Sequence, residues 1–530
     1  TFPAGITTLT LGLGLTNTGN LLPNGIALTL NGSAASYSCG TATFSSVAIS
    51  KGSSTYGVTI GSNCTFPLAG TNPSSTGDII NNGTVNVTGN WTISGSYTSN
   101  SGAILTMTGT SISLTADLTL TAGTFPAGIT TLTLGGSLTN TGNLLPNGIA
   151  LTLNGSNASY SCGTATFSSV AISKGSSTFS ATIGSNCTFP LAGTDPSSTG
   201  QIINNGTINV TGNWTITGSY TSNAGAVLIM SGTSLSLTTD LTLTAGIFPA
   251  GITSLTVSAG YDNSGNLLPN NVALSLTSVG DGTIICGSAV YASITLNKGS
   301  AADDLTPGSN CTMGDFTMGG GGDLLNPASP YTYTITGNFV QSGSGTAGGA
   351  NLTLKLTGSG TQLMSQTANT LATPLQIDNT GTVQLSTDIR SDTTCSVLAG
   401  TLFMNAKALI CNGNVTVSSG ATLQLIGNDY VVPTLNAGSI VKIVGDGDVA
   451  ADTYSLPNWS FSNLTISMTD SADSIIPNDT LATNLTGYWK MDEGSGATVD
   501  DSSSNNNIGN ITNATFSATV PTTVFSNPYS

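Results

Sequence analysis

Cysteine is the residue type whose number and spacing in this sequence point most directly to a chemistry. Three cysteine pairs are each separated by 25 residues and a fourth by 16, and no two cysteines form a C-x-x-C motif. The sequence contains no histidine, which disfavours zinc sites and thioredoxin-like redox sites. We therefore expect four disulfides and an oxidising compartment, with buried free cysteines as the alternative. The expected bridges are Cys39–Cys64, Cys162–Cys187, Cys286–Cys311 and Cys395–Cys411.

Charged side chains are too few for most kinds of active site. Lys and Arg number 8, Asp and Glu 24, and the formal net charge is −16. So few basic residues disfavour nucleic-acid binding, and no apolar run approaches the ~20 residues of a membrane span. The lack of histidine excludes Ser–His and Cys–His catalysis. The sequence predicts a protein that is not an enzyme and has no cofactor; a polysaccharide lyase or hydrolase with clustered carboxylates is the remote alternative.

One acidic segment has the spacing of a cation loop. Asp446, Asp448 and Asp452 lie within Val-Gly-Asp-Gly-Asp-Val-Ala-Ala-Asp, and a hard cation such as Ca²⁺ requires several oxygen ligands. The glycine and glutamate positions of an EF-hand are missing. A solvated turn is therefore the preferred interpretation, and calcium binding is the alternative.

Asparagine and tryptophan each allow a functional and a structural interpretation. Asn-x-Ser/Thr sequons are abundant, and Asn86 with Asn90, like Asn209 with Asn213, lie four residues apart at the edges of expected strands. These four are candidate glycosylation sites, while asparagine at coil corners and in ladders is the structural alternative. The equivalent residues Trp91 and Trp214 could stack on sugars, but aromatic residues of a core are the preferred interpretation.

The chain is built from long internal repeats. Residues 1–123 and 124–246 align without a gap and differ at 16 positions, so 107 of 123 are identical. A third copy begins at Ile247 and diverges after about Thr312. Such a period indicates an array or a solenoid. The expected divisions are 1–123, 124–246 and a degenerate copy at 247–370, further coils at 371–484 and a different segment at 485–530.

Within a repeat, the pattern is that of one short strand after another. Segments such as Ile149–Leu153 and Trp214–Thr217 alternate apolar residues with Thr, Ser or Asn, and Gly, Asn and Pro separate them. No segment has helical periodicity. Such strands favour an all-β parallel β-helix (β-solenoid) of about 20 residues per coil and five or six coils per repeat, over tandem immunoglobulin-like sandwiches. Cysteines about one coil apart would then lie at the separation that a disulfide requires.

Two segments resemble known families. Gly400–Asn405 and Asn412–Leu423 resemble coils of bacterial adhesin-like β-helix surface proteins, a resemblance that covers residues 1–467. Thr486–Gly496, with the sequence Thr-Gly-Tyr-Trp-Lys-Met-Asp-Glu-Gly-Ser-Gly, resembles the first strand of concanavalin A-like, laminin-G-type jelly rolls, and Asp501–Asn507 resembles the loop after it. The resemblance implies that 485–530 is the start of a truncated jelly roll and that the chain is part of a longer surface protein. No ligand residue of that family is present to be carried over.

These observations predict an extracellular structural or adhesive protein of the cell surface, a disulfide-stapled stalk or fibre. A carbohydrate-binding module that uses the solenoid face or the jelly roll is the alternative from another class. Residues 1–467 should form about 23 coils, roughly 110 Å of stacked chain at ~4.8 Å per coil. The first copy lacks the strand that precedes its counterparts at 124 and 247. Its edge is therefore expected to pair with further repeats upstream or with another chain in a fibre.

Overall fold

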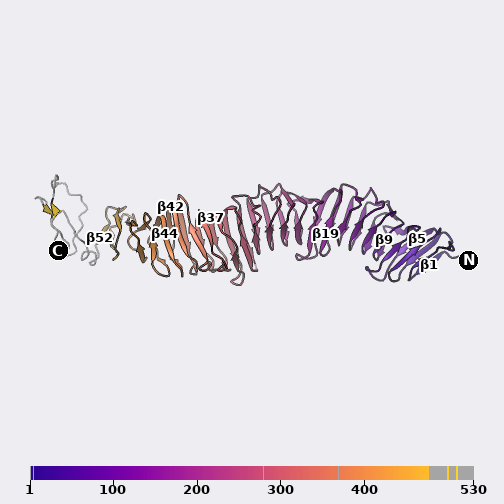
Figure 1. The fold of residues 1–530 in the computed structure, drawn as a ribbon, viewed down its shortest axis with the longest axis horizontal. Helices are drawn as coiled ribbons and strands as arrows, with labels where there is room; N and C mark the ends of the chain where they lie inside the picture. The colour runs from indigo at the N-terminus through magenta and orange to yellow at the C-terminus, as the bar shows by residue number, and fades with distance from the viewer. Residues whose placement is uncertain are drawn as a thin grey trace. The chain divides into compact units, whose positions relative to one another are not determined.

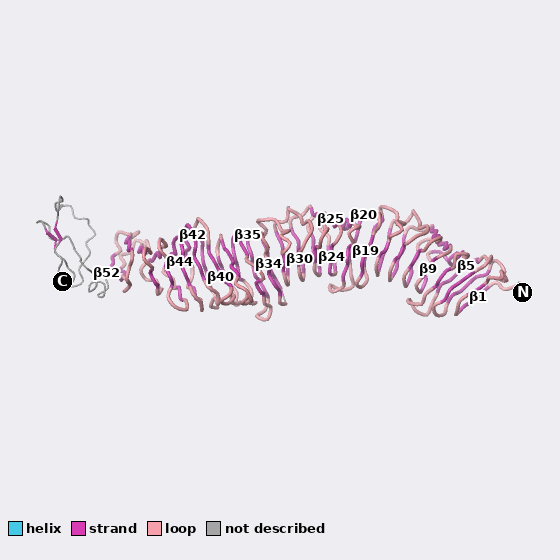
Figure 2. Tube along the Cα trace, in the orientation of Figure 1, coloured by secondary structure: helices cyan, strands magenta, loops and turns pink. Residues whose placement is uncertain are grey.

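The computed structural model describes residues 2–3, 5–278, 280–367, 369–476, 498–499 and 509–510. Short strands joined by turns make up the described residues, which include no helix (Figure 2). They form a parallel β-solenoid of about 23 turns, so the predicted fold class is confirmed. The chain divides into two compact units, Thr1–Ala292 and Ser293–Ser530.

Alternation of apolar and small polar residues produces the strands of the first unit. In β18 (Ile149–Leu153) the Ile and Leu side chains point inward and are buried, whereas Ala150 and Thr152 are partly exposed. Each coil places a similar strand above the last, so that Leu132, Leu151 and Val170 lie in register in the core. Each of these side chains is at most 1% exposed. Burial of one such side chain contributes about 1.5–3 kcal/mol, which makes the stacked core the main source of stability.

Each 123-residue copy contains fifteen strands, β1–β15 in the first and β16–β30 in the second. Six of the fifteen belong to one continuous parallel ladder, so a copy makes six coils, as the sequence predicts. Three coils of two strands are followed by three coils of three strands. The strands of successive coils stack along the first unit, as the labelled strands β1, β5, β9 and β19 (Ala158–Ser161) show in Figure 1. The strands of the first copy are β1 (Thr8–Leu11), β2 (Leu15–Thr16), β3 (Ile26–Leu30), β4 (Ala35–Ser38), β5 (Phe44–Ile49), β6 (Val58–Ile60), β7 (Thr65–Thr71), β8 (Ser74–Thr76), β9 (Ile79–Asn81), β10 (Thr84–Thr88), β11 (Trp91–Ser94), β12 (Tyr97–Ser99), β13 (Ile104–Met107), β14 (Ser111–Leu114) and β15 (Leu118–Leu120).

Strand pairing continues across the border between the first two copies. On one face β14 pairs with β16 (Thr131–Leu134), and on another β15 pairs with β17 (Leu138–Thr139). Both pairings are parallel and join residues about 20 positions apart. Separate sandwiches would instead hold their strand pairs within one copy, so the sandwich alternative is wrong.

We therefore expect limited proteolysis not to release stable fragments of 123 residues. Cleavage near Gly123 would leave the β14–β16 and β15–β17 ladders to hold the two sides together. The measurement is native mass spectrometry of a time course with a protease of broad specificity. Accumulation of separate folded products ending near residues 123 and 246 would contradict it.

Asparagine residues form the corners of the coils, as the structural alternative for this residue type predicts. Asn20, Asn143 and Asn266 occupy equivalent positions and have φ values of 51°, 54° and 55°, in the left-handed region that asparagine tolerates. The Oδ1 atom of Asn143 accepts a hydrogen bond from the backbone N–H of Thr164 on the next coil, at 2.9 Å. The corner thus links neighbouring coils as well as turning the chain.

The second unit is also built of parallel strands, and two of them have eleven and nine residues. These two strands, β42 and β44, pair with each other, and β47, β49 and β51 follow β44 in register on one side. A separate short pair, β50 and β52, is also parallel. The strands used below are β42 (Leu375–Leu385), β44 (Cys395–Phe403), β45 (Leu409–Ile410), β47 (Thr422–Leu425), β49 (Ile440–Ile443), β50 (Thr453–Ser455), β51 (Asn463–Ile466) and β52 (Ser474–Ile476).

The predicted jelly roll falls almost entirely outside the described residues. Of residues 485–530 the structure describes the antiparallel pair β53 (Thr498–Val499) and β54 (Gly509–Asn510). The resemblance of Thr486–Gly496 to a jelly-roll strand therefore stays a prediction.

Candidate functional site

All eight cysteines are disulfide-bonded. Cys39 is bridged to Cys64, Cys162 to Cys187 and Cys395 to Cys411, with Cα–Cα distances of 5.0, 5.1 and 6.0 Å. The first two distances are close to the spacing of adjacent strands, because each bridge joins neighbouring coils. Cys286 and Cys311 are likewise disulfide-bonded. The alternative of buried free thiols is wrong.

A buried asparagine holds the chain beside the first cysteine of a bridge. Asn140 is fully buried; its Nδ2 donates to the carbonyl oxygen of Cys162 at 2.8 Å, and its Oδ1 accepts from the N–H of Leu144 at 2.8 Å. Asn17 and Asn263 make the same contacts in their copies. The sequence analysis did not single out these residues. These asparagines recur at intervals of 123 residues, each 22 or 23 positions before a cysteine. That recurrence could have indicated the role.

The two repeated tryptophans belong to the core. Trp91 and Trp214 are each 1% exposed, and their Nε1 atoms donate to Ser75 Oγ and Ser198 Oγ at 3.1 Å. A buried ring has no face available to a sugar. The interpretation of these residues as core aromatics is confirmed, and their use as a glycan platform is wrong.

The candidate glycosylation residues take part in the ladders between coils. Asn90 Oδ1 accepts two backbone N–H bonds from the following coil, both at 3.0 Å, and Asn213 repeats the arrangement at 3.0 and 3.1 Å. Asn86 Oδ1 accepts from the hydroxyl of Thr106, whereas Asn209 Oδ1 is buried without a hydrogen-bond partner. These contacts give the side chains of Asn86, Asn90 and Asn213 a structural role. Glycosylation stays a prediction.

Each of the first two copies buries a lysine without a carboxylate beside it. Lys174 is 3% exposed, and its Nζ donates to the hydroxyl of Tyr160 at 2.6 Å. Lys51 makes the equivalent contact to Tyr37 at 2.8 Å and a second to the carbonyl oxygen of Ser33. Burial lowers the pKa of Lys174 to about 8, and burial followed by the charge of Asp117 raises the pKa of Tyr160 well above its usual value.

We expect the stability of the first unit to rise between about pH 8 and pH 9. Lys174 has a pKa of about 8 when folded and 10.5 as the reference value, so in this range the unfolded chain binds more protons and unfolding becomes harder as pH rises. The gain is on the order of 1 kcal/mol. Above about pH 9 the buried tyrosines reverse the trend, because burial raises their pKa values and they ionise more easily in the unfolded chain.

Guanidinium midpoints at constant ionic strength, followed by tryptophan fluorescence, measure this dependence. Lys174→Met should reduce the rise, whereas replacing the half-exposed Lys355 in the second unit should leave it unchanged. The same pH dependence in the wild type and in Lys174→Met would contradict the lowered pKa of Lys174.

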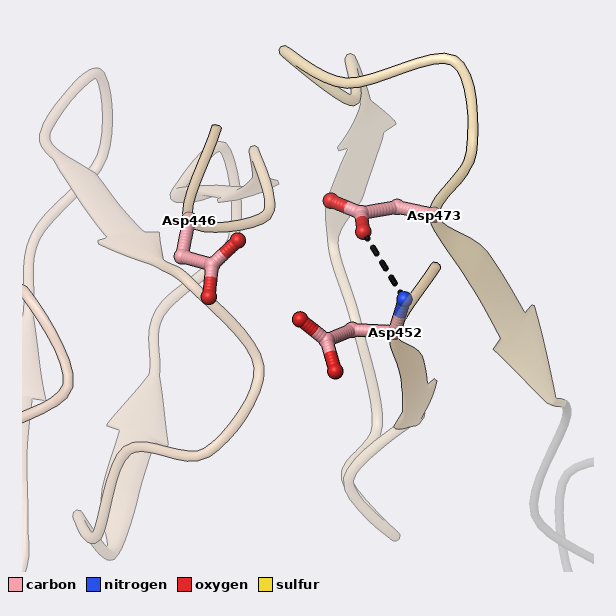
Figure 3. A group of neighbouring side chains, drawn as sticks. All are labelled: Asp446, Asp452 and Asp473. Carbon is pink, nitrogen blue, oxygen red and sulfur yellow. Dashed lines mark hydrogen bonds between the residues drawn. The ribbon is translucent and has the colours of Figure 1, made fainter. Parts of the chain in front are cut away.

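Three carboxylates converge at the end of the described second unit. Asp446, Asp452 and Asp473 each place a carboxylate oxygen within 4.8 Å of the other two, and we call them the aspartate cluster (Figure 3). Asp446 follows β49 in a turn that contains Gly445 and Gly447, with φ values of 70° and 72°. Asp452 directly precedes β50, and Asp473 directly precedes β52.

Parallel pairing explains why two of these residues meet. Thr453 of β50 is opposite Ser474 of β52, so the preceding residues, Asp452 and Asp473, occupy equivalent positions on adjacent coils. The N–H of Asp452 donates to Asp473 Oδ1 at 3.2 Å. The acidic spacing in the sequence identified Asp446 and Asp452 but missed Asp473, which lies one coil later. Asp448 is outside the cluster, and its Oδ1 accepts from the N–H of Ala450 at 2.8 Å.

The cluster is strongly negative. Partial burial, followed by the charges of Asp446, Asp448, Asp473 and Asp470, raises the pKa of Asp452. No Lys or Arg occurs between residues 443 and 489, and among the fully described residues 440–476 no ion pair includes these carboxylates. Carboxylates this close together repel one another. Such a group is stabilised by a bound cation or by a shared proton.

Comparison of the chain with models of protein families, with curated proteins and with solved structures finds no match. The adhesin-like and jelly-roll resemblances therefore stay predictions. In the part of the chain that the structure describes, no helix has the length and apolar character needed to cross a membrane.

Proposed function

We propose that the chain is the shaft of an extracellular surface protein, with a structural or adhesive role and without enzymatic activity. The observation that carries the proposal is the set of disulfides, two of which join adjacent coils with Cα–Cα distances of 5.0 and 5.1 Å. Such bridges persist in oxidising compartments outside the cytosol. Stacked coils joined in this way suit a spacer that must stay folded without a protecting cellular environment.

The near identity of the first two copies also supports a spacer. A catalytic or binding site requires only one arrangement of functional groups. The two copies share 107 of 123 residues, and the shared residues include those of the core, the corners and the disulfides. The repeated lysines, Lys51 and Lys174, are buried, and the repeated tryptophans are in the core. We therefore do not advance carbohydrate binding as a second proposal.

Deletion of residues 124–246 from the protein in cells that produce it tests the proposal. The deletion removes six whole coils and joins Gly123 to Ile247, the residue that follows Gly246 in the parent chain. We expect the shortened protein to be displayed on the cell surface with its remaining cysteines oxidised. Attachment of the cells to a surface should change in proportion to the number of copies.

The matched control deletes residues 124–133, about half a coil, and should prevent folding by breaking the register of the ladders. Antibody labelling of intact and permeabilised cells measures display, and thiol labelling without reductant measures oxidation. Retention inside the cell with free thiols would refute the extracellular assignment. If deletion of one copy abolished attachment while the protein was still displayed normally, that copy would contain a specific site and would not be a spacer.

A further inference from the structure

The aspartate cluster contains a buried oxygen atom that lacks a partner. Asp473 is 7% exposed, and its Oδ2 forms no hydrogen bond, although its Oδ1 accepts from Asp452. Leaving a buried carboxylate oxygen without a partner is costly, so this atom is a candidate ligand for a cation. In Figure 3 the Asp473 carboxylate faces the space between Asp446 and Asp452, and both of their carboxylates are directed into the same space.

Neighbouring residues leave room at this position. A Cβ atom on Gly445 would lie 2.4 Å from Asp473 Oδ2, so any other residue there would obstruct the carboxylate.

We propose that Asp446, Asp452 and Asp473 bind a calcium ion. Ca²⁺ takes oxygen ligands at about 2.3–2.6 Å, so two ligands on opposite sides of one ion lie up to about 5 Å apart. The cluster meets this limit, because its three oxygens are within 4.8 Å of one another. Mg²⁺ requires nearly ideal octahedral geometry at about 2.0–2.1 Å and keeps most of its water, which fits three converging carboxylates less well.

The ion would connect three separate segments of the second unit. Asp446 comes from the turn after β49, whereas Asp452 and Asp473 come from two successive coils. Neutralising their charge removes the repulsion between them and fixes the turn against the coils. The inference does not depend on the proposed function, since a calcium site in this position is compatible with any role of the chain.

Isothermal titration calorimetry of the purified 530-residue chain with CaCl₂ tests the proposal. We expect one ion to bind per chain with a Kd on the order of 10⁻⁴–10⁻³ M, the range of extracellular calcium modules. Asp473→Asn should weaken binding at least about tenfold, because it removes a charge while its amide oxygen can still accept from Asp452. Asp240→Asn is the matched control, since Asp240 is exposed in the first unit and accepts from the N–H of Gly260 at 2.7 Å.

Hydrogen exchange provides a second readout that does not depend on the heat released by binding. Calcium should protect amides of residues 446–476 relative to the same chain in EDTA, and Asp473→Asn should abolish that protection. If about 10 mM Ca²⁺ produced neither a heat of binding nor protection of amides from hydrogen exchange, the proposal would be overturned. So would unchanged affinity in Asp473→Asn, and equal affinity for Mg²⁺ would overturn the choice of calcium.

Discussion

Replacing Trp214 by alanine is expected to destabilise the coils of the second copy by about 3–5 kcal/mol. The indole is 1% exposed, donates to Ser198 Oγ and packs edge-to-face on Tyr220 at 5.7 Å between ring centroids. Alanine would leave a large cavity and deprive the buried Ser198 hydroxyl of its donor. In a solenoid each coil contacts only its neighbours, so the damage should be confined to nearby coils.

Amide hydrogen exchange followed by mass spectrometry measures this local effect better than a single unfolding midpoint, because long arrays often unfold in steps. Protection should fall in the coils around β26 (Trp214–Thr217) and stay unchanged around Trp91 in the first copy. Ile229→Ala, at a side chain that is 54% exposed, is the control and should change little. Uniform loss of protection over both copies would contradict the local model.

Removing the bridge between Cys162 and Cys187 is expected to lower the stability of the same copy by about 3 kcal/mol. The two residues are 25 positions apart, and a bridge of this span reduces the entropy of the unfolded chain. The double variant Cys162→Ala/Cys187→Ala avoids leaving one free thiol. Its guanidinium midpoint should fall relative to the parent chain.

A matched variant is available in the second unit. Cys395→Ala/Cys411→Ala removes a bridge of 16 positions and should leave hydrogen exchange in the second copy unchanged. Alkylation of the parent chain without reductant should modify no cysteine. Modification of all eight would contradict the bridges and weaken the extracellular proposal with them.

Local repetition explains why so much of the fold could be predicted from the sequence. Strands such as Ile149–Leu153 carry the alternating pattern in five residues, and the 123-residue period gives the number of coils once the coil length is known. The bridges Cys39–Cys64 and Cys162–Cys187 follow from the same spacing. In each of these cases the relevant neighbours are related by a regular interval along the chain.

The aspartate cluster and the buried lysines were harder to predict because their neighbours depend on the path of each coil. Asp473 reaches Asp452 only through the β50–β52 register, 21 residues along the chain. Lys174 meets Tyr160 across the inside of a coil, and nothing in the sequence around either residue distinguishes it from an exposed one. Irregular coil lengths in the second unit make such positions difficult to calculate from sequence.

The disulfides between neighbouring coils also determine how the chain would respond to mechanical force. A pull on the two ends of an unbridged coil would peel its strands away and lengthen the molecule by the extended length of that coil. A covalent bridge carries the load past the loop that it closes. For Cys162 and Cys187 the loop of 25 positions would keep roughly 80 Å of extended chain out of the load path. A chain under tension would thereby yield in short steps and keep these coils available to refold when the tension falls.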